Sequence, residues 1–155
     1  LLKELKKIQE KYLDKNLPQL EIVDSSLENM VPLYNSCDCL ISTSSSEGFG
    51  LPMLEAMAAN LLVVSTGKSG QSDFLHKDNS LEIEVYKDFA PPQYQYWENS
   101  DGATTFFPKR DSIIENMINA YKNKEYLLSK FDKECKKTIS KYTWESAVSK
   151  ILELS

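Results

Sequence analysis

One stretch of the sequence, residues 44–60, strongly limits what this chain can fold into. It joins a serine-rich loop that contains two glycines to an apolar segment of helical character. Pro52 suits the start of a helix because its missing N–H would be unpaired there, and Asn60 suits a helix end because asparagine tolerates the left-handed backbone. We therefore predict a polar loop over residues 44–50 and a helix over residues 52–59.

Glu55 is the only polar side chain of this predicted helix. A helix that is apolar on nearly every side is expected to be buried, and a buried carboxylate needs a partner. We therefore expect Glu55 to be buried and to face a site. The alternative is a structural glutamate paired with a cation such as Lys68. For Glu47, in the loop, the alternative to a site residue is a solvated carboxylate.

The loop in front of the predicted helix is a candidate anion site. It offers the backbone N–H groups of Gly48, Phe49, Gly50 and Leu51. Glycine leaves the backbone open to a ligand, and the first N–H groups of a helix have no acceptor within the helix. An anion is therefore favoured at this end.

Short apolar segments alternate with helical patterns along the chain. Strands are expected at residues 20–23, 39–43, 61–65 and 81–85, and helices at residues 1–16, 28–36, 52–59 and 73–76. This alternation predicts an α/β fold, a Rossmann-like parallel sheet with helices on both faces. Residues 86–103 read as a loop excursion, followed by a helical C-terminal tail. Its first helix is expected to be capped by Asp111 or Ser112. Two further helices are expected at residues 125–141 and 143–154, the second with Trp144 in the core.

Three loops leave the carboxyl ends of predicted strands, at residues 24–27, 44–50 and 66–71. All three are rich in Ser, Gly or Asp. Ligands of open parallel sheets bind outside the carboxyl ends of the strands. We therefore expect the three loops to converge in one crevice, where Lys68 could add a cation.

Composition narrows the function classes. A chain of 155 residues with 41% hydrophobic residues is expected to form a single globular domain, and a net charge of −5 argues against a nucleic-acid partner. Cys37, Cys39 and Cys135 form no even-numbered framework and read as reduced thiols of a cytoplasmic protein, without a metal cluster. No run approaches the roughly 18 apolar residues of a membrane span. Since the sequence starts at Leu1 inside a helical pattern, we expect it to be part of a longer protein.

The stretch from Glu47 to Ala58 resembles the E-x7-E signature of family 4 glycosyltransferases, retaining enzymes of the GT-B fold, also known as glycosyl transferases group 1. Glu47 and Glu55 stand eight positions apart with Gly-Phe-Gly following the first. Residues 33–38 resemble the family's "LY..AD" segment, residues 62–65 with 69–74 its "PVV.S..GG..E.I" segment, and residues 142–144 its "FSW" segment. Four ordered segments make the resemblance fairly specific over residues 20–154.

The resemblance implies a role for each matching residue. The chain would be the C-terminal, donor-binding half of a GT-B fold, with UDP- or GDP-sugar as donor and no metal or other cofactor. Glu55 would hold the donor's ribose hydroxyls, and Glu47 would hold hydroxyls of the transferred sugar as the catalytic-site carboxylate rather than as a nucleophile. The backbone at residues 48–51 would contact sugar and diphosphate, and Ser25 and Leu27 would lie near the base.

The sequence also departs from the family pattern. Asn60 and Ser69 stand where the family usually has Gly, Leu62 where it has Pro, and Asp73 where it has Glu. The family's Arg and Lys that clamp the diphosphate would precede Leu1, as would the first strands and the acceptor-binding N-terminal domain. We therefore expect the chain alone to be inactive and any membrane association to depend on the missing half.

The predicted function is thus donor binding within a glycosyltransferase whose acceptor is unknown. Within the enzyme class, a glycogen-synthase-like or phosphorylase-like enzyme is the near neighbour, and no segment resembles the pyridoxal phosphate lysine of a phosphorylase. The alternative from another class is a non-catalytic doubly wound module that binds a nucleotide or a protein. A purely structural module has no use for both Glu47 and Glu55 at one loop and helix start.

Overall fold

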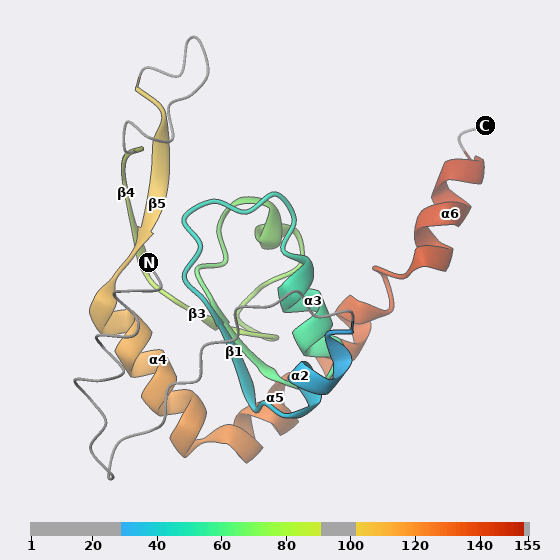
Figure 1. Cartoon of the computed structure of the whole chain (residues 1–155), viewed down its shortest axis with the longest axis horizontal. Helices are drawn as coiled ribbons and strands as arrows, with labels where there is room; N and C mark the ends of the chain where they lie inside the picture. Colours follow the sequence, from blue (N-terminus) through green and yellow to red (C-terminus); the bar gives the residue numbers. More distant parts are fainter. Residues whose placement is uncertain (1–28, 91–101, 154–155) are drawn as a thin grey trace. The chain divides into compact units, whose positions relative to one another are not determined.

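A computed structural model of the chain describes residues 29–90 and 102–153 (Figure 1). The backbone divides into a unit of Leu1–Met30 and a unit of Val31–Ser155. All elements below belong to the second unit. The predicted helix at 1–16, the strand at 20–23 and the loop at 24–27, with Ser25 and Leu27, lie outside the described residues.

Among the described residues, a parallel sheet of three strands forms the centre of the second unit. β2 (Leu62–Ser65) lies between β1 (Cys39–Ser42) and β3 (Leu81–Glu82), and both neighbours run parallel to it. All four residues of β2 are buried, as expected for a strand that is covered on both faces. The predicted strands at 39–43 and 61–65 are therefore confirmed to within a residue.

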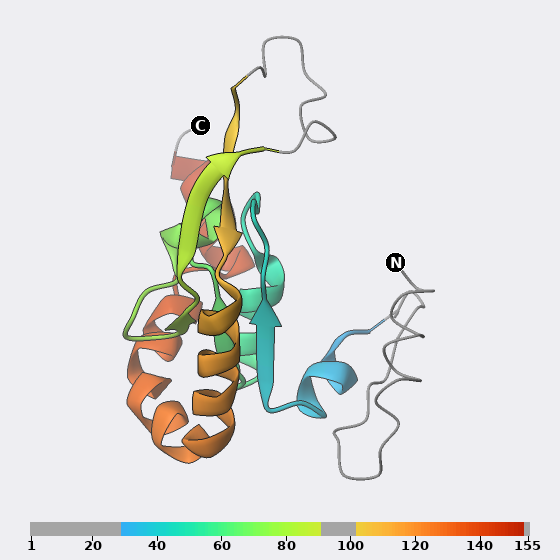
Figure 2. The ribbon, with the colours of Figure 1, turned by 90° about the vertical axis from the view of Figure 1, so that its left-hand side faces the viewer.

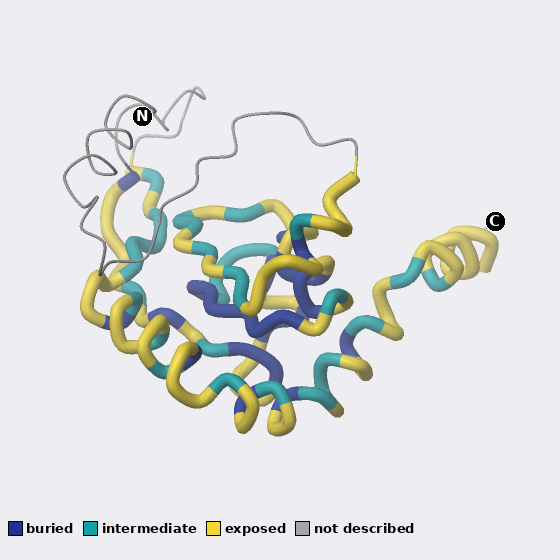
Figure 3. Tube along the Cα trace, turned by 60° about the horizontal axis from the view of Figure 1, so that its bottom comes forward, coloured by how far each residue is buried: buried dark blue, intermediate teal, exposed yellow. Residues whose placement is uncertain are grey.

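Helices cover both faces of this sheet. Val63 of β2 packs in one core with buried residues of α2 (Val31–Asn35) and α3 (Leu51–Ala58). The next residue, Val64, packs in the other core with α4 (Arg110–Lys122) and α5 (Lys124–Ile139). Figure 2 shows α4 and α5 beside the sheet, and Figure 3 shows the buried segments where helices and sheet meet. The α/β class with helices on both faces is confirmed.

Residues 81–108 differ from the prediction. The expected strand at 81–85 is β3, which ends at Glu82. A separate strand, β4 (Val85–Phe89), begins at Val85, extends into the expected loop at 86–103, and pairs antiparallel with β5 (Thr104–Pro108). Tyr86 stacks on Phe107 across this ribbon, with ring centroids 5.5 Å apart. Cross-strand pairs of this kind stabilise a ribbon. The sequence of β4 mixes polar and aromatic residues and does not indicate that β5 pairs with it. This segment was therefore predicted as a loop.

Three local predictions about helices are wrong. The short helix expected at 73–76 is a 3-10 helix, η1 (Ser69–Asp73), which begins earlier. Ser112 does not cap α4; its Oγ accepts a hydrogen bond from the Glu84 N–H at 2.9 Å. Trp144 is not in the core, because it is 86% exposed and α6 (Trp144–Glu153) has no buried residue. An amphipathic pattern predicts a helix but does not show what covers its apolar side.

No helix in the described ranges 29–90 and 102–153 is long and apolar enough to cross a membrane.

The buried side chain of Met53 provides a test of the core. Met53→Ala should lower the free energy of unfolding by about 2–4 kcal/mol, because Met53 is 1% exposed and its loss leaves a cavity beneath α3. Met117→Ala is the matched control, since Met117 on α4 is 47% exposed and its loss should cost at most about 0.5 kcal/mol. Urea unfolding measures both, and equal losses would contradict this assignment of the core.

Candidate functional site

The loops that follow β1 and β2 are hydrogen-bonded to each other. The Gly70 N–H donates to the Glu47 carbonyl at 2.9 Å, and the Thr66 hydroxyl donates to the Ser44 carbonyl, also at 2.9 Å. The predicted convergence of the loops at 44–50 and 66–71 is therefore confirmed. The third predicted loop, at 24–27, lies outside the described residues.

Gly70 is the point of closest approach between the two loops. A Cβ atom at this position would lie 1.9 Å from the Gly48 carbonyl oxygen and 2.9 Å from the Phe49 nitrogen. Only glycine allows the two backbones to come this close. The sequence suggested that the glycines of these loops leave room for a ligand, whereas Gly70 leaves room for the neighbouring loop.

The buried side-chain amide of Gln71 stabilises the same contact between the two loops. Nε2 of Gln71 donates to Ser65 Oγ at 3.0 Å and to Thr66 Oγ1 at 2.9 Å. The Thr66 hydroxyl gives its own proton to the Ser44 carbonyl, so it must accept from Gln71, and this fixes the orientation of the amide. Nothing in the sequence around Gln71 indicates that its amide is buried, since polar side chains surround it there.

A third contact joins the first loop to the β4–β5 ribbon. The Thr105 hydroxyl of β5 donates to the Ser45 carbonyl at 2.8 Å. Most of β4 was predicted as part of an irregular loop and β5 was not predicted, so the role of the ribbon in holding residues 44–50 was not foreseen. The loop is thus supported by β5 and by the segment that contains Thr66 and Gly70.

The loop leads into a helix start that no side chain caps. Gly50 precedes α3 with φ 96° and ψ 43°, a left-handed conformation that favours glycine, and Pro52 lies in the first turn. Asn60, after the helix, has φ 60°, as predicted. Pro52 has no N–H, and the Met53 N–H donates to the Gly50 carbonyl at 3.0 Å. With no side-chain cap on α3, the Leu51 N–H of the first turn is left for a ligand or solvent. The predicted loop–helix geometry is confirmed to within a residue.

Glu55 differs from the prediction in its environment. It lies on an exposed side of α3 rather than in the core, because buried residues of α3 gather on its other side. Its partner is Tyr34 of α2, whose hydroxyl donates to Oε2 of Glu55 at 2.7 Å. Burial raises the pKa of Tyr34 to about 12, and the hydrogen bond and the negative charge of Glu55 add to the rise. Tyr34 therefore stays protonated and keeps the Glu55 carboxylate in place.

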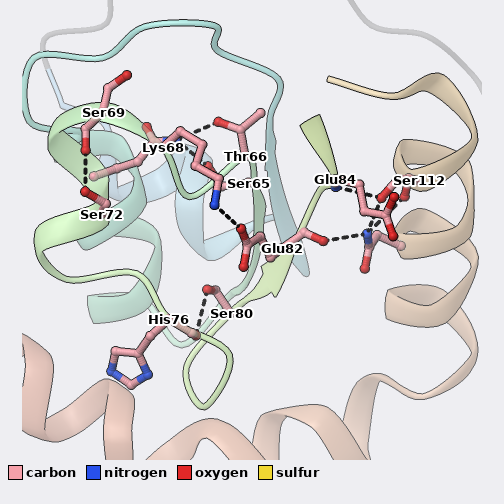
Figure 4. A network of polar contacts seen from close by, with 12 residues as sticks. Ser65, Thr66, Lys68, Ser69, Ser72, His76, Ser80, Glu82, Glu84 and Ser112 are labelled. Atoms are coloured by element: carbon pink, nitrogen blue, oxygen red, sulfur yellow. Dashed lines mark hydrogen bonds and ion pairs between the residues drawn. The ribbon is translucent and has the colours of Figure 1, made fainter. Parts of the chain in front are cut away.

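Lys68 does not pair with Glu55. Its Nζ lies 2.6 Å from Oε1 of Glu82, at the end of β3, so the alternative of a Glu55–Lys68 ion pair is wrong (Figure 4). Both side chains of the pair are partly exposed. The positive charge of Lys68 is therefore partly neutralised at the edge of the site.

The described part of the chain contains no second candidate site built on a metal or on a reactive thiol. No group of three or more His, Cys, Asp or Glu side chains that could hold a metal is found there. The cysteines are free thiols. Burial raises the pKa of Cys39 and of Cys135 to about 11, with smaller contributions from Asp38 and Asp132. Neither thiol is therefore activated as a nucleophile. His76 is exposed.

Comparison with known proteins gives two findings. A family model described as "Glycosyl transferases group 1" matches residues 2–88. Among solved structures, the chain is similar to the 1.35 Å crystal structure of the C-terminal domain of a glycosyl transferase group 1 family protein, LpcC, from Francisella tularensis, with a TM-score of 0.56 and 23% identity. The likeness covers 91% of this chain and 61% of that chain, so this chain spans about three-fifths of the length of that one. A search of curated proteins found no match.

The close contact at Gly70 predicts a large difference between two glycines. Gly70→Ala should lower the free energy of unfolding by about 2 kcal/mol or more, because its Cβ would collide with the Gly48 carbonyl and force the loops apart. Gly48→Ala is the matched control, since no atom lies within 4 Å of an added Cβ there. Thermal unfolding of both variants measures the difference, and a Gly70→Ala variant as stable as the control would rule out the loop contact.

Titration of Tyr34 tests its link to Glu55. The absorbance difference between wild type and Tyr34→Phe should show a phenol with a pKa of about 12, above the ordinary value of 10.0. Since the folded state holds this proton more tightly than the unfolded state, the stabilisation is complete below pH 10.0 and falls as the pH rises through about 12. In Glu55→Ala the pKa should move partly back, because burial remains. A phenol that titrates at its ordinary pKa would contradict the assignment.

Proposed function

The chain belongs to the glycosyl transferases group 1 family, and on that premise we propose that its loop–helix site binds the nucleoside-diphosphate sugar donor of a glycosyltransferase. The donor is a UDP- or GDP-sugar, and a further domain of the same protein holds the acceptor. The enzyme is of the retaining, family 4 type with a GT-B fold. The similarity of this fold to the C-terminal domain of LpcC supports the proposal.

The observation that carries this proposal is the arrangement around α3. An uncapped helix start with a left-handed Gly50 lies between Glu47, in the loop before it, and Glu55, on the exposed side of the helix. The helix start favours an anion, and carboxylates favour groups that donate hydrogen bonds. A nucleotide sugar carries both kinds of group, since its diphosphate is an anion and its two sugar rings carry hydroxyls.

Glu55 is assigned to the ribose of the donor. The Tyr34 hydroxyl engages Oε2, so we assign Oε1 to a ribose hydroxyl. A carboxylate whose side chain is already held in one orientation loses less rotational freedom on binding, which favours affinity. Tyr34 therefore acts in this proposal as the residue that orients Glu55.

Glu47 is assigned to hydroxyls of the transferred sugar. Its backbone carbonyl is fixed by the Gly70 N–H, and its side chain is partly exposed beside the loop. The N–H groups of Gly48, Phe49, Gly50 and Leu51 are assigned to the sugar and the diphosphate. Ser25 and Leu27 remain assigned to the surroundings of the base, outside the described residues.

The proposed chemistry is the breaking of the bond between the sugar's anomeric carbon and the diphosphate oxygen. The leaving diphosphate keeps the electron pair, the acceptor oxygen forms the new bond to the anomeric carbon, and the proton of the acceptor hydroxyl passes to the leaving diphosphate. Negative charge grows on the leaving oxygens in the transition state, so fixed N–H groups and the helix dipole lower the barrier. This role needs no nucleophilic side chain, and Glu47 is assigned to binding and orienting the sugar. The proposed site uses no metal.

Ligand-observed NMR with UDP, GDP and their sugars tests the proposal. We expect wild type to bind at least one of these ligands weakly. Glu55→Ala should weaken binding by about tenfold or more, because it removes a charged hydrogen-bond acceptor. Glu115→Ala, which changes an exposed glutamate of α4, should bind as wild type does.

Two results would overturn this assignment. The first is that no nucleoside diphosphate binds at millimolar concentration, which would favour a non-catalytic module with another partner. The second is that Glu55→Ala, with its fold intact, binds as tightly as the Glu115→Ala control.

A further inference from the structure

We infer that Tyr142 is a positioning residue of the candidate site, which acts through Phe49 on the loop before α3. The ring contact stands on the geometry alone, and its effect on donor binding rests on the proposed function. Tyr142 lies between α5 and α6, more than 80 residues along the chain from the loop that it supports.

Three aromatic rings beside the site contact one another. The ring centroid of Phe49 lies 5.5 Å from that of Phe74 and 5.7 Å from that of Tyr142. Phe74 and Tyr142 are 5.8 Å apart. The rings meet at interplanar angles of 54°, 62° and 64°, which are the tilted and edge-on arrangements that aromatic pairs favour. Each ring therefore contacts both of the others.

Phe49 is the side chain through which this cluster can hold the loop. It stands between Gly48 and Gly50, neither of which has a side chain to pack. An added Cβ at Gly48 would meet nothing within 4 Å, so this part of the loop is open on that side. The ring of Phe49 therefore restrains the peptide units before and after it, whose N–H groups the proposed function assigns to the donor.

Tyr142 is suited to support Phe49 because it is itself anchored. Its backbone N–H donates to the Ile139 carbonyl at the end of α5, at 3.1 Å. Its hydroxyl donates to the Asp73 carbonyl at the end of η1, at 3.2 Å. Cys135, one turn before Ile139, packs against both cores of the domain. Tyr142 thus connects the end of α5 to the loop before α3 through the ring of Phe49.

Tyr142 therefore affects ligand binding without contacting the ligand. Removal of the Tyr142 ring takes away two of the three ring contacts in the cluster and leaves Phe49 held by Phe74 alone. The loop then opens more often, and its N–H groups are less well fixed for the donor. Removal of the hydroxyl alone leaves the ring contacts in place.

Hydrogen exchange of the whole chain, followed by mass spectrometry, tests the ring contact without any ligand. In Tyr142→Leu and Tyr142→Ala, the peptide that contains Gly70, whose N–H donates to the Glu47 carbonyl, should exchange about tenfold faster, while the peptide that contains β2 stays protected. Tyr142→Phe should match wild type to within about twofold. Tyr121→Ala is the control, since Tyr121 on α4 is 88% exposed.

Two results of the exchange experiment would overturn the inference. Unchanged exchange of the peptide that contains Gly70 in the Tyr142→Leu variant overturns the inference. So does a Tyr142→Phe variant that exchanges as fast as Tyr142→Leu, because the hydroxyl rather than the ring would then support the loop. If Tyr142→Ala unfolds throughout, Tyr142→Leu, which keeps an apolar side chain of moderate size, decides the question.

Binding of UDP or GDP separates this inference from the proposed function. Where wild type binds either nucleotide, Tyr142→Leu should weaken binding by about tenfold and Tyr142→Phe should leave it unchanged. Equal affinity in wild type and Tyr142→Leu overturns the positioning role, even if exchange of the loop rises. Where wild type binds neither nucleotide, the proposed function fails, and the exchange experiment still decides whether Tyr142 holds the loop.

Discussion

The hydrogen bond from the Gly70 N–H to the Glu47 carbonyl is the interaction on which the candidate site depends. It forms only where two backbones approach within a distance that excludes a Cβ atom, and Gly70 meets that condition. The Thr66 hydroxyl strengthens the same junction by satisfying the Ser44 carbonyl. Two loops that would otherwise move separately therefore form one surface, and the start of α3 is held against it.

The two loops meet because β1 and β2 end side by side at the same edge of the sheet. Ser42, the last residue of β1, lies in register with Ser65, the last residue of β2, so both loops leave the sheet at one edge. This register is stable because β2 places Val63 in one core and Val64 in the other, and a slip by one residue would exchange the two faces. Packing in the middle of the domain thus fixes the position of polar groups at its edge.

The features that were predicted correctly are those that residues close together in the sequence determine. Pro52 and Asn60 mark the ends of α3 because each favours a particular backbone conformation, and the apolar run of β2 indicates that this strand is buried. The β4–β5 ribbon, the exposure of Trp144 and the Tyr34–Glu55 hydrogen bond were not predicted. Each of these depends on a partner distant in the sequence, and a single sequence without its relatives does not reveal such partners.

Charge places a limit on how the proposed donor complex is arranged. Glu47, Glu55 and a diphosphate are all negative, so the diphosphate is stable only on the N–H groups at the start of α3, with both carboxylates turned toward hydroxyls. Lys68 offsets this repulsion only in part, because Glu82 already shares its charge. A nucleotide without ribose hydroxyls would leave the Glu55 carboxylate, held in place by Tyr34, with no donor from the ligand. Selection for the ribose in this arrangement therefore follows from the charged hydrogen bonds that its hydroxyls would donate to Glu55.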